Sequence, residues 1–182
     1  MNGRIAPVAA LAGMLFGASA FAANILVNPG FETGSLAPWF GNFGAPTVGN
    51  TDPHTGTFAA EAFGGDSLRQ NFAPVPTSDI TEVSVWIKRP PFQFSQYSFY
   101  YSDNTSTTHL IQGNSSNYDQ FNLTSNLTAG KSLNGFSIFG TSSGPAFLDD
   151  FVIDAIPEPA GAALALAAIV GAAVRPRRRR VA

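Results

Sequence analysis

The chain has 182 residues, a formal net charge of −2 and no cysteine, which excludes disulfides, thiolate metal sites and cysteine nucleophiles. Residues 24–156 hold four basic and eleven acidic residues, so this part has a net charge of −7. Because phosphate contacts favour clustered Lys and Arg, we expect no nucleic-acid partner for it.

Residues 1–23 have the pattern of a secretory signal peptide. Arg4 gives a positive start, residues 5–16 are mostly apolar, and Ala-Phe-Ala at 20–22 fits the small-x-small cleavage rule. The alternative is an N-terminal helix of the fold, which the lack of an amphipathic period disfavours. We therefore expect a signal helix that directs export, followed by the folded domain.

Residues 24–156 are typical of a single all-β domain. Turn residues separate short runs rich in Val, Ile, Phe, Tyr and Thr. These runs predict strands at 24–28, 56–63, 67–73, 80–89, 94–101, 107–112, 118–124, 133–140 and 147–154. Many short strands with turn signals indicate a β-sandwich or barrel, and we expect a jelly-roll β-sandwich.

Aromatic residues gather in the predicted strand 94–101 and form the candidate carbohydrate surface. Tyr97, Phe99 and Tyr101 share one face of that strand, because side chains alternate along it. Arg89 is a nearby hydrogen-bond donor, and Trp39 lies in a glycine-rich loop. The alternative is that these rings form the core, since a β-sandwich needs buried aromatic residues.

Several short motifs resemble, in their order, the jelly-roll carbohydrate-binding modules attached to bacterial glycosidases. They are the start NILVNPGFETG at 24–34, Pro38-Trp39, the turn His54-Thr55-Gly56 and the closing LDDFVI at 148–153. The resemblance covers about residues 24–154 and implies a jelly-roll fold with polysaccharide as the ligand. The same scaffold also occurs in surface proteins without sugar binding, so it implies the fold more strongly than the function.

The resemblance also implies a structural Ca²⁺ between the first and last strands. Its side-chain ligands would be Glu32 and Asp149, with Asp150 as the alternate, and Thr55-Gly56 would supply backbone oxygens. Oxygen ligands without thiols suit Ca²⁺ rather than Zn²⁺. The alternative is that Glu32 caps a turn and the Asp pair is solvated.

The parity of the closing strand bears on the choice between the two aspartates. Asp149 and Asp150 are adjacent, so their side chains should point to opposite faces of the strand. Asp149 has the parity of Phe151 and Ile153, which predicts that it faces the apolar side, where a carboxylate needs a cation.

The C-terminal residues 157–182 resemble a PEP-CTERM sorting signal. Pro157-Glu158-Pro159 is followed by an apolar run at 160–174 and by a basic end that includes Arg177, Arg178, Arg179 and Arg180. Pro176 interrupts the basic cluster, which departs from the pattern of that signal. The resemblance implies a bacterial protein that is held in the inner membrane by the apolar helix and cut near the Pro-Glu-Pro by a membrane sorting enzyme, an exosortase. It would then reach the cell surface or extracellular matrix. The alternative is a simple tail anchor.

No catalytic motif stands out in the sequence. It contains no Gly-x-Ser-x-Gly, HExxH, P-loop or dinucleotide fingerprint, and no spacing favours a glycosidase carboxylate pair. We therefore expect a non-catalytic exported protein that binds polysaccharide at the cell surface. The alternatives are a structural matrix protein without specific glycan binding and, less favoured, a small secreted hydrolase.

Overall fold

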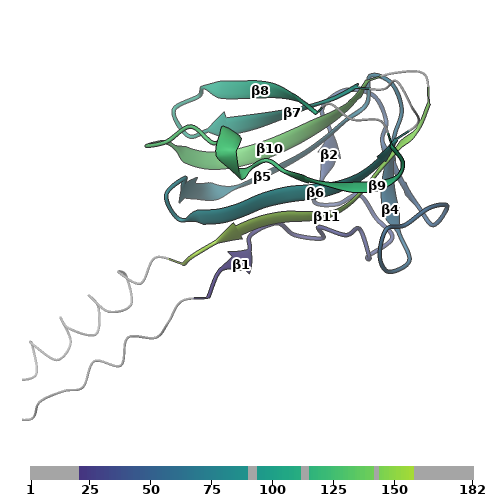
Figure 1. Cartoon of the computed structure of the whole chain (residues 1–182), viewed down its shortest axis with the longest axis horizontal. Coiled ribbons are helices and arrows are strands. Elements are labelled where there is room, and N and C mark those ends of the chain that lie inside the picture. The colour runs from purple at the N-terminus through teal and green to yellow at the C-terminus, as the bar shows by residue number, and fades with distance from the viewer. Residues whose placement is uncertain (1–20, 90–93, 112–114, 142–143, 158–182) are drawn as a thin grey trace, which may run out of the picture. The chain divides into compact units, whose positions relative to one another are not determined.

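The computed structural model describes residues 21–89, 94–111, 115–141 and 144–157 (Figure 1). Residues 1–20 of the predicted signal peptide lie outside the described residues. So do Glu158, Pro159, the predicted helix at 160–174 and the arginines at 177–180. Within the described ranges, no helix has the length and apolar character needed to cross a lipid bilayer.

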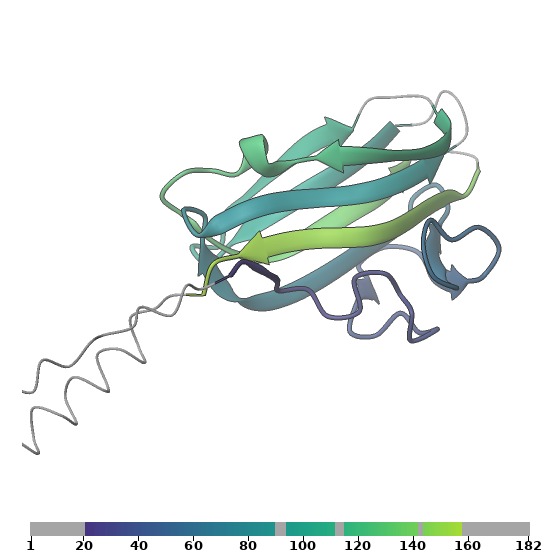
Figure 2. The ribbon, with the colours of Figure 1, turned by 60° about the horizontal axis from the view of Figure 1, so that its bottom comes forward.

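The described residues form strands that build two antiparallel sheets, which appear as two layers in Figures 1 and 2. The strands are β1 (Ala23–Asn24), β2 (Phe40–Gly41), β3 (Thr47–Gly49), β4 (Ala59–Ala62), β5 (Ser67–Pro76), β6 (Ile80–Arg89), β7 (Phe94–Tyr101), β8 (Ser106–Ile111), β9 (Ser115–Asn122), β10 (Ser132–Thr141) and β11 (Ala146–Ala155). Sheet A has the order β3-β4-β11-β6-β9, with β1 paired to β11, and sheet B has the order β2-β5-β10-β7-β8. The predicted all-β sandwich is confirmed.

The core lies between the two sheets and follows from side-chain alternation. In β6, Val83, Val85 and Ile87 are buried against sheet B, as the alternation predicts. In β10 of sheet B, Phe136 and Ile138 are buried in the same core. The structure also contains two very short strands, β2 and β3, that the sequence pattern did not predict, because two or three residues carry too little periodicity.

An aromatic cluster joins the N-terminal segment to this core. The Trp39 ring lies 4.7 Å from the Phe151 ring, and Phe31 meets Phe151 edge-on at 5.9 Å between ring centroids. The Trp39 indole N–H donates to the backbone oxygens of Val27 and Asn28. Trp39 is therefore a core residue, and its prediction as a carbohydrate contact is wrong.

The other residues of the predicted carbohydrate surface are also buried. Tyr97, Phe99 and Tyr101 share one face of β7 as predicted, but their exposed fractions are 1%, 0% and 2%. That face of β7 points between the sheets, so the rings pack in the core rather than against solvent. Arg89 is also buried, and its guanidinium donates from Nη1 to the backbone oxygen of Ile111. The carbohydrate surface predicted from these residues is therefore wrong.

The described N-terminal segment and the end of β11 lie side by side. Ala23 of β1 pairs with Ala155 of β11, and Ile25 N–H donates to the backbone oxygen of Ile153. The predicted strand 24–28 is reduced to its first residue, because the backbone N–H groups of Leu26 and Val27 donate to the side chains of Asn24 and Gln70 instead of to β11. The start of the domain is thus fixed to its last strand.

Candidate functional site

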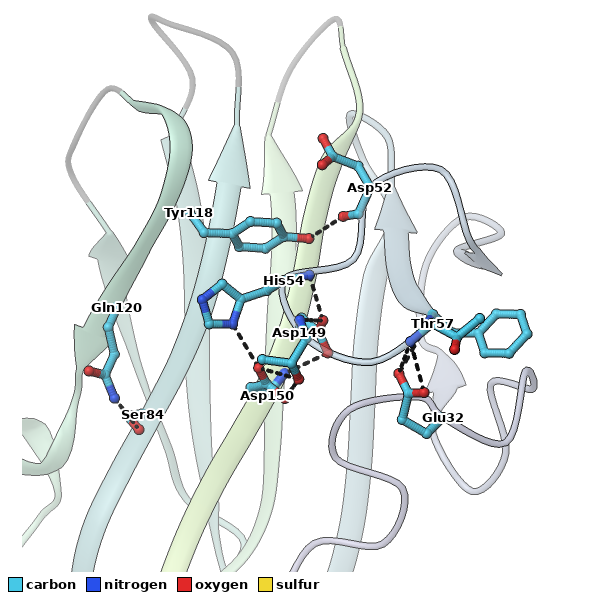
Figure 3. Close-up of polar contacts among 11 residues, drawn as sticks. Glu32, Asp52, His54, Thr57, Ser84, Tyr118, Gln120, Asp149 and Asp150 are labelled. Carbon is cyan, nitrogen blue, oxygen red and sulfur yellow. Dashed lines mark hydrogen bonds and ion pairs between the residues drawn. The ribbon is translucent and has the colours of Figure 1, made fainter.

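Three carboxylates hold the loop of residues 52–58 on the outer face of sheet A (Figure 3). The buried Asp149 accepts hydrogen bonds at Oδ2 from the backbone N–H groups of His54 (2.9 Å) and Thr55 (3.2 Å), and at Oδ1 from the N–H of Asp150 (2.8 Å). Burial raises the pKa of Asp149, and these N–H donors oppose that rise. Asp149 thus connects the last strand to the loop.

Asp150 and Glu32 bind the same loop from two sides. Asp150 Oδ2 lies 2.7 Å from His54 Nδ1, and the Thr55 hydroxyl donates to the same carboxylate at 2.9 Å. Glu32 accepts from the backbone N–H groups of Thr57 (3.0 Å) and Phe58 (3.0 Å). Residues far apart in the sequence therefore meet at one turn.

Aromatic rings cover the loop's other side. The His54 ring stacks on Trp86 with 4.0 Å between centroids, and the Tyr118 ring lies 4.9 Å from His54. The Tyr118 hydroxyl donates to the backbone oxygen of Asp52. Burial, followed by the nearby carboxylates, raises the pKa of Tyr118. The loop is thus held by both hydrogen bonds and ring packing.

A β-bulge in β11 explains why Asp149 is buried. Asp149 pairs with Trp86, and Val152 pairs with Ser84, so two residues of β11 stand opposite Val85. Asp150, one of these two, has φ +45°. The extra residue reverses the alternation, and Asp149 lies on the outer face beside Trp86. The prediction from parity that Asp149 lies on the core face with Phe151 is therefore wrong, and the covering loop buries Asp149 instead.

The structure brings the predicted calcium residues Glu32, Thr55, Gly56, Asp149 and Asp150 to one place. A Cβ built on Gly30 would lie 3.3 Å from Asp150 Oδ1, 3.5 Å from Asp149 Oδ1 and 3.9 Å from Glu32 Cγ. The two aspartate carboxylates therefore border a position without a side chain, whereas the Glu32 carboxylate lies beside Gly56.

The donors fit a hard cation in chemical type, because they are all oxygens. Among the described residues, however, no group of three or more His, Asp or Glu is placed to hold a metal by itself. Backbone oxygens and water would have to complete the six to eight ligands that Ca²⁺ takes.

The outer face of sheet B presents a second, different arrangement around Tyr100. The Arg69 guanidinium carbon lies 3.7 Å from the centre of the Tyr100 ring, and Arg69 Nε donates to Asn71 Oδ1 at 2.9 Å. The Tyr100 hydroxyl shares a hydrogen bond with Ser137 Oγ at 3.1 Å. A ring, a guanidinium, an amide and a hydroxyl therefore lie together on one face.

Exposed aromatic side chains extend this face. Phe40, paired with Arg69 across the sheet, is 40% exposed, and Phe43 is 59% exposed. The Phe43 ring packs 5.7 Å from the Phe139 ring, whose residue follows Ser137 by two positions and so shares its face.

Beside Tyr100 is a hollow of about 300 Å³. Its lining combines Arg69, Tyr100 and Tyr101 with the amide or hydroxyl groups of Asn104, Thr105, Ser106 and Asn134. We call the surface formed by Tyr100, Arg69, Asn71, Phe40, Phe43, Phe139 and this hollow the Tyr100 face. Ser137 is fully buried and contributes only by holding the Tyr100 hydroxyl.

Sequence reasoning missed the Tyr100 face although its signal was present. Side-chain alternation puts Tyr100 on the face of β7 opposite to Tyr97 and Tyr101, but alternation alone does not say which face of a strand meets the core. Arg69 and Asn71 share one face of β5 because they are two residues apart. Since β5 and β7 both pair with β10, these two side chains come close to Tyr100.

No protein-family model and no curated protein matches the chain. Several solved carbohydrate-binding modules are similar in structure. The CBM22-1 xylan-binding domain from Paenibacillus barcinonensis matches with a TM-score of 0.53 and 14% identity, over 76% of this chain and 98% of that domain. A family 16 carbohydrate-binding module matches with a TM-score of 0.52 and 16% identity, over 71% of this chain and 98% of that module. These similarities show the jelly-roll sandwich fold.

Proposed function

We propose that the chain is a non-catalytic polysaccharide-binding protein whose ligand lies on the Tyr100 face. The observation that carries this proposal is the half-buried Tyr100 on an outer sheet face, beside Arg69, Asn71 and a polar hollow. The buried Ser137 holds the Tyr100 hydroxyl in place. Sugar rings have apolar C–H faces and hydroxyl edges. On this surface the exposed Phe40 and Phe43 rings offer apolar area to the C–H faces. The guanidinium stacked on Tyr100, the Asn71 amide and the polar hollow offer partners to the hydroxyl edges.

The shape of this surface supports a chain-like ligand. The Tyr100 face spans β2, β5, β10 and β7, four neighbouring strands of sheet B, and carries exposed rings at Phe40 and Phe43. The similar domains include one described as xylan-binding, and a family 22 module with its xylanase was solved with xylohexaose. For this chain we propose the same general class of ligand, a polysaccharide.

The test is binding of the purified 182-residue chain to a broad polysaccharide panel, with a matched pair of tyrosine variants. Tyr100→Ala should weaken binding about tenfold or more, because it removes the ring at the centre of the face. Tyr118→Ala, which removes a half-buried tyrosine from the outer face of sheet A, should leave binding unchanged. Loss with Tyr118→Ala alone would place the ligand on sheet A. No binding by a folded sample would favour a structural matrix protein.

We also propose that the protein is exported and sorted through its two ends. The support is the signal-peptide pattern at 1–23 and the order of Pro157-Glu158-Pro159, apolar run and arginine cluster. Replacing the arginines at 177–180 with serine should change the mass of the mature protein and its location. Unchanged mass and surface location would contradict the sorting proposal.

A structural Ca²⁺ at the 52–58 loop is the third part of the proposal. Glu32, Asp149 and Asp150 would contribute carboxylate oxygen, and the ion would link the start of the domain, the loop and β11. Binding to the folded state alone stabilises it by about 2.7 kcal/mol at 100 times the Kd. Melting in Ca²⁺ and in EDTA should differ accordingly, and equal melting temperatures would rule the ion out.

A further inference from the structure

We infer that the polysaccharide bound on the Tyr100 face is acidic, and that Arg69 pairs with its carboxylate or sulfate groups. This inference rests on the proposed function and names the class of its ligand.

Arg69 is the one Lys or Arg side chain of the described residues that is neither buried nor paired with a carboxylate. Lys88, in sheet A, forms an ion pair with Asp52. Lys131 forms one with Asp103 at 2.9 Å. Arg89 lies in the core. A partly exposed guanidinium without an acidic partner is a ready donor for an anion, because its planar fork matches the two oxygens of a carboxylate or sulfate.

Arg69 is also held in place. Its Nε donates to Asn71 and its plane lies over Tyr100, so the side chain is ordered before any ligand arrives. Neither Nη atom donates a hydrogen bond to another described residue, and both remain for a ligand. A pre-ordered fork loses little side-chain entropy on binding, which favours its use as an anion site.

The hollow beside Arg69 has no acidic lining. Its other polar groups are the uncharged side chains of Asn104, Thr105, Ser106 and Asn134. They supply donors to a sugar and place no negative charge in the hollow that would repel an anion. Among the described residues, Arg69 is therefore the only charged one that lines the hollow, and it gives the site a positive charge.

Asp103 lies in the turn next to the hollow, and its negative charge is paired with Lys131. Its carboxylate accepts hydrogen bonds from Thr105 and from Lys131, and these contacts lower the pKa of Asp103 to about 2. Its charge is thus balanced by Lys131.

The overall charge makes such binding a specific test. Residues 24–156 carry a net charge of −7, so a polyanion is repelled by the domain as a whole. Preference for an acidic glycan would then have to come from a local cation and not from diffuse attraction. Arg69 is the described side chain placed to supply it.

The experiment is calorimetric titration of the purified 182-residue chain with matched polysaccharides. One pair is a polyuronate and its carboxyl-reduced, neutral counterpart, and the other is a sulfated glycan and its desulfated counterpart. We expect one acidic member to bind about tenfold or more tightly than its neutral partner. The pair that shows the difference distinguishes carboxylate from sulfate.

Three variants assign the effect. Arg69→Gln should remove the preference for the acidic member, and Arg69→Lys should retain part of it because the charge stays but the fork is lost. Lys88→Gln, which changes the net charge equally on the other sheet, should keep the preference. Melting curves confirm that each variant is folded.

The failures are distinguishable. Equal binding of acidic and neutral partners would overturn the acidic ligand and leave the proposed function standing. A preference that survives in folded Arg69→Gln would overturn the role of Arg69. A folded protein that binds none of the glycans, including the neutral panel, would overturn the proposed function and this inference with it.

Discussion

Replacing Gly56 with alanine should destabilise the domain through a contact with Glu32. Gly56 has φ +63°, in the left-handed region that glycine enters easily. A Cβ at this position would lie 2.4 Å from Cδ and Oε1 of Glu32 and 2.6 Å from Oε2. The Glu32 carboxylate would have to move away from the N–H groups of Thr57 and Phe58 that it accepts from.

The expected loss has two parts. A non-glycine residue in the left-handed region costs roughly 1–2 kcal/mol. Displacing the Glu32 carboxylate gives up its backbone hydrogen bonds, at about 1 kcal/mol each before a reduction for its exposure to solvent. Gly56→Ala should therefore lower the free energy of unfolding by about 3 kcal/mol, which for a domain of this size is roughly 10 °C in melting temperature.

Gly130→Ala is the matched control. Gly130 has φ +76°, and no atom lies within 4 Å of a Cβ built on it, so its substitution should show only the backbone part, about 1–2 kcal/mol. Urea unfolding of both variants, measured in EDTA to exclude cation binding, gives the difference. A double-mutant cycle with Glu32→Ala then isolates the contact, because Gly56→Ala should cost only the backbone part once the carboxylate is gone.

Two results would refute this reasoning. If Gly56→Ala is no more destabilising than Gly130→Ala, the contact with Glu32 contributes nothing. If the loss from Gly56→Ala is the same with and without the Glu32 side chain, the destabilisation has another origin.

Three further predictions concern packing and charge. Phe151→Ala should lower stability by about 4 kcal/mol in urea unfolding, since it empties the centre of the aromatic cluster, and a loss below about 1 kcal/mol would contradict that packing. Asp149→Ala should lose about 3 kcal/mol because three backbone N–H groups lose their acceptor, whereas Asp150→Asn should lose less than about 1 kcal/mol, since Asn tolerates positive φ; equal losses would be evidence against the loop contacts described. The Asp103 carboxyl should titrate at about 2 by NMR, and Lys131→Ala should raise that midpoint. Because its pKa falls on folding, its contribution to stability is present above the unfolded pKa and disappears as pH falls toward 2; a midpoint near 4 would disprove the pairing.

The sequence predicted the sandwich because the two-residue period is strong where one face of a strand is buried. In β6, Val83, Val85 and Ile87 lie on the buried face and Trp86 on the other, as the two-residue period requires. The residues that meet at the loop site, Glu32, Thr55, Gly56, Asp149 and Asp150, were grouped by the resemblance in motif order alone, and the structure brings them together. Local pattern and a resemblance in order were sufficient for both.

The failures arise where a tertiary feature decides the outcome. One extra residue at Asp150 reverses the alternation of β11, and nothing in the run Leu-Asp-Asp-Phe indicates where the strand bulges. For β7 the two faces were separated correctly, but both carry aromatic rings, so composition could not tell the core face with Tyr97 from the outer face with Tyr100. That choice depends on which side the other sheet packs.

Gly135 shows why the Tyr100 face was hard to find from residue types alone. It lies in β10 between β5 and β7, and a Cβ there would lie 2.8 Å from Asn71 Oδ1 and 3.5 Å from the Tyr100 Cβ. The missing side chain is what lets the Asn71 amide lie across the strand and accept from Arg69. Glycine inside a strand usually weakens it, so its presence here is better explained by the close approach that it allows. The surface therefore depends on a residue with no functional group, which a search for chemically active side chains passes over.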